Sequence, residues 1–247
     1  MKKTLLAVLL GSFALASFAQ PITIEKQGAF SAGGTVIEAK KTFDPYHPEP
    51  DAMTLHGDHA NIIYQIPAHA KPVSLMFLHG AGQSMRTWQT TPDGREGFQS
   101  VFLRKGYPVY LIDQPRRGDA GRATVHGTIK ASPDEQFWFG QFRMGLWPKF
   151  YDNSAFASQK DLNSFWRQMT PNTAPYNDKV IADAVTDALK KTEGTVLVTH
   201  SQGCGPGWLI GTEAGKNLKG IIAFEPGSGF IFPEGKVPAP ISNNSFF

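Results

Sequence analysis

Short apolar runs of strand type alternate along this chain with helical patterns. The run over residues 72–78 is almost continuously apolar, which is typical of a strand covered on both faces. Residues 22–39 predict an opening pair of strands around Gly33-Gly34. Further strands are predicted at residues 60–66, 107–112, 195–199 and 219–224.

Helical spacing of apolar residues marks several of the segments between these strands. Residues 98–105 predict one helix, and residues 206–214 predict the start of another. The clearest amphipathic pattern covers residues 177–191, where Asn177 or Asp178 can cap the first turn. The alternation of strand, helix and strand predicts an α/β fold with a mostly parallel sheet, flanking helices and catalytic residues at the carboxyl ends of strands.

Residues 114–175 are long for a connection between two strands. We interpret them as a partly helical, cap-like insertion that lies over the site. The alternative is an aromatic-rich flank that only packs on the body. The segment contains the aromatic residues Phe137, Trp138, Phe139, Phe142, Trp147, Phe150, Tyr151, Phe156, Phe165 and Trp166.

The strand at residues 195–199 ends abruptly in His200-Ser201-Gln202-Gly203. A strand that enters a tight turn before a helix can hold a serine hydroxyl above the sheet edge, so Ser201 is the candidate nucleophile. Gly203 and Gly205 supply the small neighbours that such a turn needs. Thr199 stands where the first glycine of the motif is usual, which weakens the signal slightly.

Two other strand ends carry candidate catalytic groups. Leu78-His79-Gly80-Ala81-Gly82 follows a buried strand, where the backbone N–H of Ala81 could pair with that of Gln202 to bind an oxyanion. His79 is expected to be a structural hydrogen-bonding residue. Glu225 ends the next strand, where its carboxylate could orient a histidine. The alternative for Glu225 is an exposed or salt-bridged glutamate.

These three pieces, in this order, resemble the α/β-hydrolase superfamily. More narrowly, residues 28–229 are similar to a small family of exported bacterial carboxylesterases with a Ser-Glu-His triad. That likeness implies Ser201 as nucleophile, Glu225 as acid, and Ala81 and Gln202 as oxyanion donors. It rests on the strings Phe77-Leu78-His79-Gly80, Thr87-Trp88-Gln89-Thr90-Thr91-Pro92-Asp93-Gly94-Arg95, Phe102-Leu103-Arg104-Lys105-Gly106-Tyr107, Ile112-Asp113-Gln114, Thr199-His200-Ser201-Gln202 and Phe224-Glu225-Pro226-Gly227.

All 7 histidines lie at or before the nucleophile turn, whereas the resemblance implies a catalytic histidine after the last strand. His200 is expected to point into the sheet. His126, in the long insertion, could swing over the site and replace the missing catalytic histidine, which is a weaker alternative. Residues 230–247 look like an abrupt stop, so we expect a truncated hydrolase domain without its last strands. The expected function is a serine carboxylic-ester hydrolase acting through an acyl-enzyme, impaired in this chain. The alternative is an inactive fragment or binding module, and Ser201 speaks against a haloalkane-type hydrolase.

The first residues predict an export signal. Two lysines precede an apolar stretch over residues 5–18 that is too short to span a membrane, and Ser17-Phe18-Ala19 fits the small-x-small cleavage rule. We expect a signal peptide over residues 1–19 and a mature hydrolase domain over residues 20–247, located in the bacterial periplasm or secreted. An N-terminal membrane anchor is the alternative; after cleavage no stable membrane insertion is expected.

The composition of the chain limits the classes of partner that we expect. The net charge of +3 is small, and the basic residues form no stripe, so no nucleic-acid partner is indicated. The single cysteine, Cys204, excludes an intramolecular disulfide and is expected to pack beneath the nucleophile turn. The resemblance implies a small-molecule ester as substrate, with no metal or organic cofactor.

Overall fold

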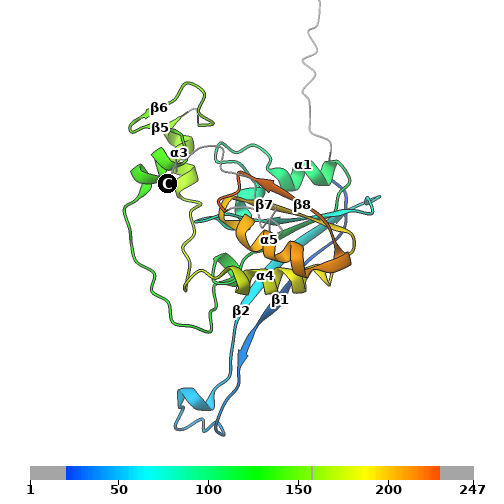
Figure 1. Cartoon of the computed structure of the whole chain (residues 1–247), viewed down its shortest axis with the longest axis vertical. Helices are drawn as coiled ribbons and strands as arrows, with labels where there is room; N and C mark the ends of the chain where they lie inside the picture. The colour runs from blue at the N-terminus through cyan, green and yellow to red at the C-terminus, as the bar shows by residue number, and fades with distance from the viewer. Residues whose placement is uncertain (1–20, 157, 229–247) are drawn as a thin grey trace, which may run out of the picture.

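The computed structural model describes residues 21–156 and 158–228, which build one six-stranded sheet with helices on both faces (Figure 1). The order across the sheet is β1-β2-β4-β3-β7-β8. Strands β3, β4, β7 and β8 run parallel, whereas β2 is antiparallel to both β1 and β4. The strands are β1 (Ile24–Ile37), β2 (Leu55–Pro67), β3 (Ser74–Leu78), β4 (Val109–Asp113), β7 (Thr195–His200) and β8 (Leu218–Phe224).

Strands β3, β4 and β7 are largely buried on both sides because each face of the sheet carries its own core. Helix α1 (Phe98–Arg104) covers one face, where Phe77, Leu111 and Val198 are buried. Helices α4 (Asp178–Leu189) and α5 (Cys204–Glu213) lie together on the other face (Figure 1). The predicted helices and parallel strands are therefore confirmed, with shifts of a few residues at their ends.

The prediction of two strands in residues 22–39 is wrong, because β1 is one strand that pairs with β2 along its whole length. Gly33 and Gly34 have φ of 63° and 99°, so they bend the strand without reversing it. A Cβ at Gly33 would lie 2.6 Å from the Cα of Ala184, and the Gly33 N–H donates to Asp187. The glycine pair thus serves close packing against α4, which a sequence pattern cannot distinguish from a turn.

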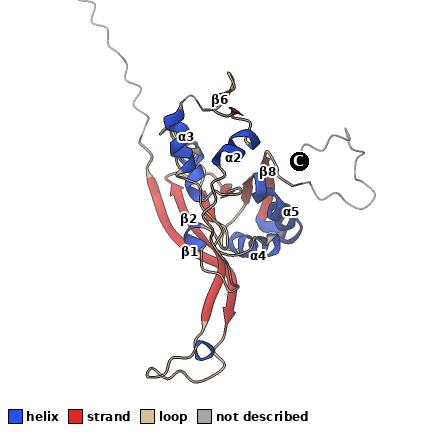
Figure 2. Cartoon of the chain, turned by 90° about the vertical axis from the view of Figure 1, so that its left-hand side faces the viewer, coloured by secondary structure: helices blue, strands red, loops and turns tan. Residues whose placement is uncertain are grey.

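The far ends of β1 and β2 form a hairpin that projects from the body. The pairing of Ile37 with Leu55 closes the ladder, and residues 38–54 connect the two strands. Figures 1 and 2 show this arm at one end of the molecule and the helices of the insertion at the other. The arm is therefore remote from the strand ends that carry the predicted chemistry.

The described part of residues 114–175 contains a 3-10 helix at Gly118–Ala120, two α-helices and a short hairpin, with a small core of its own. Phe139, Met144 and Leu162 are buried there, against further aromatic side chains. The elements are α2 (Glu135–Gln141), β5 (Gly145–Leu146), β6 (Lys149–Phe150) and α3 (Gln159–Trp166).

Three expectations from the sequence fall wholly or mainly outside the described residues. These are the signal peptide over residues 1–19, the abrupt ending over residues 230–247, and the absence of the last strands of the fold. Within residues 21–156 and 158–228, no helix combines the length and the apolar character needed to cross a bilayer.

Candidate active site

Ser201 lies in a sharp turn between β7 and α5, as the sequence predicts. Its φ of 51° is a left-handed conformation that a non-glycine residue rarely adopts. A Cβ at Gly203 would lie 2.5 Å from the carbonyl oxygen of His79, so glycine is required there. The N–H of Gly227 donates to the carbonyl oxygen of Ser201 at 3.0 Å, which joins the loop after β8 to the turn. The turn is thus held in a strained geometry from two sides.

Thr199 fits this turn because a glycine on the following helix makes room for it. Thr199 is fully buried, and its hydroxyl lies 3.1 Å from the Sγ of Cys204. A Cβ at Gly207 would come within 2.9 Å of the Thr199 methyl carbon. Cys204 is buried beneath the turn, as expected. The compensating role of Gly207 was not visible in the sequence, since the two residues meet only in the folded turn.

The loop after β3 packs directly against the nucleophile turn. A Cβ at Gly80 would lie 2.9 Å from the Cβ of Ser201. Among the described residues, the N–H of Ala81 has no hydrogen-bond acceptor. The N–H of Gln202 belongs to the first turn of a 3-10 helix, where backbone donors have no intrahelical partner. Both N–H groups are therefore suited to bind an anionic oxygen beside Ser201.

His79 is a structural residue of this loop. It is fully buried; its Nδ1–H donates to the carbonyl oxygen of Gly80 at 3.1 Å, and its Nε2 accepts from the N–H of Gln114 at 3.4 Å. Burial lowers the pKa of His79 to about 3, and the nearby Arg117 charge acts in the same direction. The imidazole is therefore neutral at ordinary pH, which is consistent with one nitrogen donating and the other accepting.

Glu225 follows β8 with a φ of 43° and lines the same cavity as Ser201. The cavity, of about 570 Å³, also contains side chains from the insertion. One carboxylate oxygen of Glu225 accepts from the guanidinium of Arg143 at 3.1 Å, and both side chains are largely exposed. The structure thus places Glu225 near Ser201 and also pairs it with an arginine, the alternative left open by the sequence.

His200 lies beside the site, and His126 lies away from it. His200 is half-buried, its Nδ1 is 3.1 Å from the Oε1 of Gln83, and its ring lines the Ser201 cavity. The expectation that His200 points wholly into the sheet is therefore only partly met. His126 is exposed and lines no cavity at Ser201 or Ala81. Among the described residues, no side chain hydrogen-bonds to the hydroxyl of Ser201.

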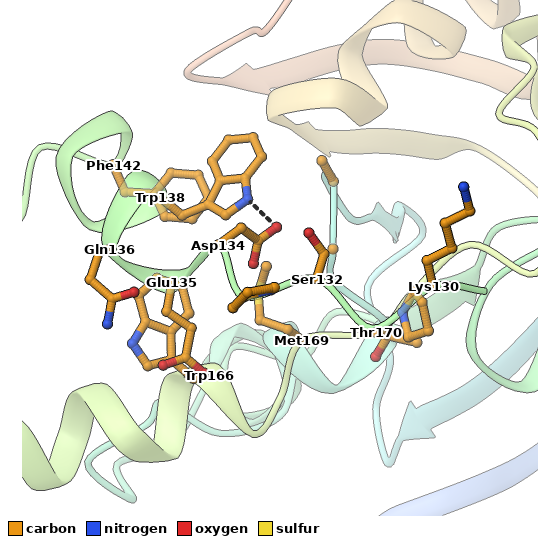
Figure 3. Close-up of a pocket in the computed structure, with 14 residues that line it drawn as sticks. Lys130, Ser132, Asp134, Glu135, Gln136, Trp138, Phe142, Trp166, Met169 and Thr170 are labelled. Carbon is orange, nitrogen blue, oxygen red and sulfur yellow. Dashed lines mark hydrogen bonds between the residues drawn. The ribbon is translucent and has the colours of Figure 1, made fainter.

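A second cavity, of about 600 Å³, borders the loop after β3. Ala81 and Gly82 contribute to its lining. Trp138, Phe142 and Trp166 of the insertion also line it (Figure 3). Trp138 and Phe142 stack with ring centroids 5.1 Å apart and line both cavities. The Nε1–H of Trp138 donates to Asp134, the bond drawn in Figure 3. The two rings therefore stand between the two cavities.

The sequence did not single out Arg117, because the basic residues were considered only as a possible nucleic-acid-binding stripe. Arg117 is 2% exposed, and its guanidinium reaches Gly80, Asn172 and Gln202. No local signal could have identified it, because its three partners are distant from one another in the sequence.

Comparison with protein-family models gives the family. Residues 75–245 match the model of the "Alpha/beta hydrolase family". The chain belongs to the alpha/beta hydrolase family. Its strand order, its nucleophile turn and the packing of the loop after β3 against that turn are those of an alpha/beta hydrolase fold, so the fold class predicted from the sequence is confirmed.

Two relatives agree with this family. A protein of Fungal sp. (strain ATCC 74256), named "Probable secreted lipase phiG", is 32% identical over 165 residues. The match covers 63% of this alpha/beta hydrolase and 45% of the fungal protein, so it spans less than half of that relative. A solved structure described as a novel bacterial esterase superposes with a TM-score of 0.72 at 28% identity, covering 84% of this chain and 70% of the esterase.

Proposed function

We propose that this chain is a serine carboxylic-ester hydrolase that acts through an acyl-enzyme. The observation that carries the proposal is Ser201, held at a φ of 51° in the turn after β7 and sharing a cavity with Glu225. Strained backbone at such a turn is typical of a nucleophile that must project above a sheet. Relatives named lipase and esterase support the same class of reaction.

The reaction follows from the placement of these groups. The hydroxyl oxygen of Ser201 attacks the ester carbonyl carbon, and the carbonyl electron pair moves to the oxygen, where the N–H groups of Ala81 and Gln202 bind it. Collapse of this intermediate expels the alcohol and leaves an acyl group on Ser201, which water then removes. The attack needs a base that takes the serine proton; in a complete triad a histidine would do so, and Glu225 would orient it.

Among the described residues, no histidine is hydrogen-bonded to the hydroxyl of Ser201, so none is in position to act as the base. Glu225 instead bonds to Arg143, which would have to release the carboxylate when a histidine engages it. Loss of one triad member typically costs on the order of 10⁴-fold in rate. We therefore propose slow turnover by this chain, with the residual rate arising from the oxyanion donors and binding.

The insertion over residues 114–175 is proposed as a cap that binds the apolar part of the ester. Its aromatic side chains line both cavities beside the reacting groups. Residues 20–247 would form the mature hydrolase domain after removal of the signal peptide at residues 1–19, in the periplasm or outside the cell. The substrate is a small-molecule ester, and no cofactor takes part.

A non-catalytic binding module is the second candidate, favoured by the ion pair between Glu225 and Arg143. Hydrolysis of p-nitrophenyl acetate by the purified chain and by Ser201→Ala, with and without added imidazole, separates the two. We expect a slow Ser201-dependent rate that imidazole raises, because imidazole can act as the base. We expect Glu225→Gln to reduce this increase, because the carboxylate can orient the bound imidazole. Equal rates for the chain and Ser201→Ala under both conditions would favour the binding module, and fast turnover without imidazole would contradict the impairment.

A further inference from the structure

The guanidinium of Arg117 is buried at the junction of three segments. Its Nη1–H donates to the carbonyl oxygen of Gly80 at 2.7 Å. Its Nε–H and Nη2–H donate to Oδ1 of Asn172 at 2.8 and 2.5 Å, and Nη2–H also reaches Oε1 of Gln202 at 3.2 Å. Arg117 thus joins the loop after β3, the nucleophile turn and the returning end of the insertion.

From these contacts we infer that Arg117 is the positioning residue of the oxyanion hole. It fixes the peptide between Gly80 and Ala81 and the residue Gln202 in one arrangement, ready to receive the oxyanion. The inference rests on the proposed function of Ser201 and deepens it, because it assigns a residue that orients both oxyanion donors without touching the substrate.

Arg117 can orient the N–H of Ala81 because the peptide bond between Gly80 and Ala81 is planar. The carbonyl of Gly80 and the N–H of Ala81 belong to the same trans peptide, so they point in opposite directions within one plane. Arg117 and His79 both donate to that carbonyl, at 2.7 and 3.1 Å. Fixing the carbonyl therefore fixes the direction of the Ala81 N–H. A cationic donor on the carbonyl also polarises the peptide and makes its N–H a stronger donor.

Arg117 also holds Gln202 in place. Its amide oxygen accepts from the same guanidinium, while its backbone N–H is the other proposed oxyanion donor. The two donors thus come from residues tied to a single rigid fork of fixed geometry, which a lysine could not reproduce because its ammonium is a point donor. Preorganised donors cost no rearrangement when charge develops, which is the source of their catalytic effect.

The positive charge of Arg117 also favours binding of an oxyanion. Its hydrogen bonds go to neutral oxygens, and no carboxylate is hydrogen-bonded to it among the described residues. Burial lowers the pKa of Arg117 to about 10, so the group stays cationic at neutral pH. A buried positive charge close to the oxyanion site favours the negative charge that develops on the carbonyl oxygen.

Arg116 provides a matched control for this test. It lies one residue away and is 7% exposed, but it pairs with Asp58 at 2.7 Å and donates to the carbonyl oxygen of Pro175. It therefore anchors the start of the insertion without contacting Gly80 or Gln202. A change at Arg116 tests the loss of a buried arginine as such.

The experiment measures the rate of Ser201 phosphonylation against the concentration of an alkyl fluorophosphonate in the unchanged chain, Arg117→Met, Arg117→Lys and Arg116→Lys. This gives the maximal rate and the half-saturating concentration separately. We expect Arg117→Met to lower the maximal rate by about 10²-fold with little change in the half-saturating concentration, and Arg117→Lys to recover only part of it. Arg116→Lys should retain the rate. Two results would overturn the inference: a folded Arg117→Met protein whose maximal labelling rate is within about threefold of wild type, or one in which only the half-saturating concentration changes.

A crystal structure of Arg117→Met tests the same inference independently of activity. We expect the Gly80 carbonyl to have rotated or the Ala81 nitrogen to have moved from its place beside Ser201. An unmoved Gly80–Ala81 peptide and an unmoved Gln202 would overturn the positioning role. If Ser201 of the unchanged chain takes no label, the proposed function fails, and the position of this peptide in the variant still decides the role of Arg117.

Discussion

His79 shows how burial and hydrogen bonding together assign a role to a titratable residue. Sequence position beside the oxyanion loop suits either a base or a structural residue, and the fully buried ring with both nitrogens hydrogen-bonded makes it structural. The sequence correctly favoured this role for His79. It could not assign Arg117, because a pair of adjacent arginines looks the same whether its side chains are solvated or, as here, turned into the molecule.

The depressed pKa of His79 predicts a loss of stability in acid. The folded state resists protonation of this ring down to about pH 3, whereas the unfolded chain takes up the proton below about pH 6.5. Stability from this group is thus complete above pH 6.5 and is lost as the pH falls. Between pH 7 and pH 5 the free energy of unfolding should fall by about 2 kcal/mol from His79 alone.

Urea unfolding of the chain and of His79→Gln at pH 7 and pH 5 checks this prediction. The burial-raised pKa of Asp113 acts in the opposite sense. Because its Oδ1 lies 3.7 Å from the Nε2 of His79, the difference between the two proteins reports His79 together with its effect on Asp113. The loss on acidification should be clearly smaller in His79→Gln. The same loss in both proteins would show that His79 does not carry the effect.

At the scale of elements, the nucleophile turn depends on a fit between β7 and α5. Thr199 occupies the place of a usual glycine because Gly207 leaves room for its methyl group. The hydroxyl of Thr199 is held by Cys204, so the side chain cannot rotate away at no cost. A methyl group added at Gly207 must therefore push against a fixed neighbour 2.9 Å away.

We predict that Gly207→Ala destabilises the protein by about 1–3 kcal/mol, the usual cost of overpacking a core. In a Thr199→Ser background, which removes only the methyl group and keeps the hydroxyl, the cost should fall substantially. A double-mutant cycle measured by thermal or urea unfolding gives the coupling between the two sites. An equal cost in both backgrounds would contradict the fit described here.

The elements that the sequence predicted well are those where one pattern has one physical meaning. Continuous apolar runs at β3, β4 and β7 indicate strands buried on two faces, and periodic apolar residues at α4 indicate a helix on a core. The prediction of a turn at Gly33-Gly34 was wrong because paired glycines suit a turn and a close contact with a neighbouring helix equally well. The approach of α4 decides between them, and it exists only in the folded protein.

At the scale of the whole molecule, the parallel sheet gathers residues that are far apart in the chain. Ala81, Ser201 and Glu225 follow three different strands, and they come together because β3, β7 and β8 end at the same edge. This part of the site was predictable from topology. The division of the space beside it by Trp138 and Phe142 was not, since it depends on how the insertion folds over that edge.

Labelling of the purified chain with a fluorophosphonate, followed by intact mass and compared with Ser201→Ala, tests the central claim most directly. We predict slow incorporation of one label on Ser201, because the strained turn and the oxyanion donors favour attack even when a triad member is not engaged. The label should be absent from the Ser201→Ala protein. A folded chain that takes no label, or a label that persists in Ser201→Ala, would contradict Ser201 as the nucleophile of an ester hydrolase.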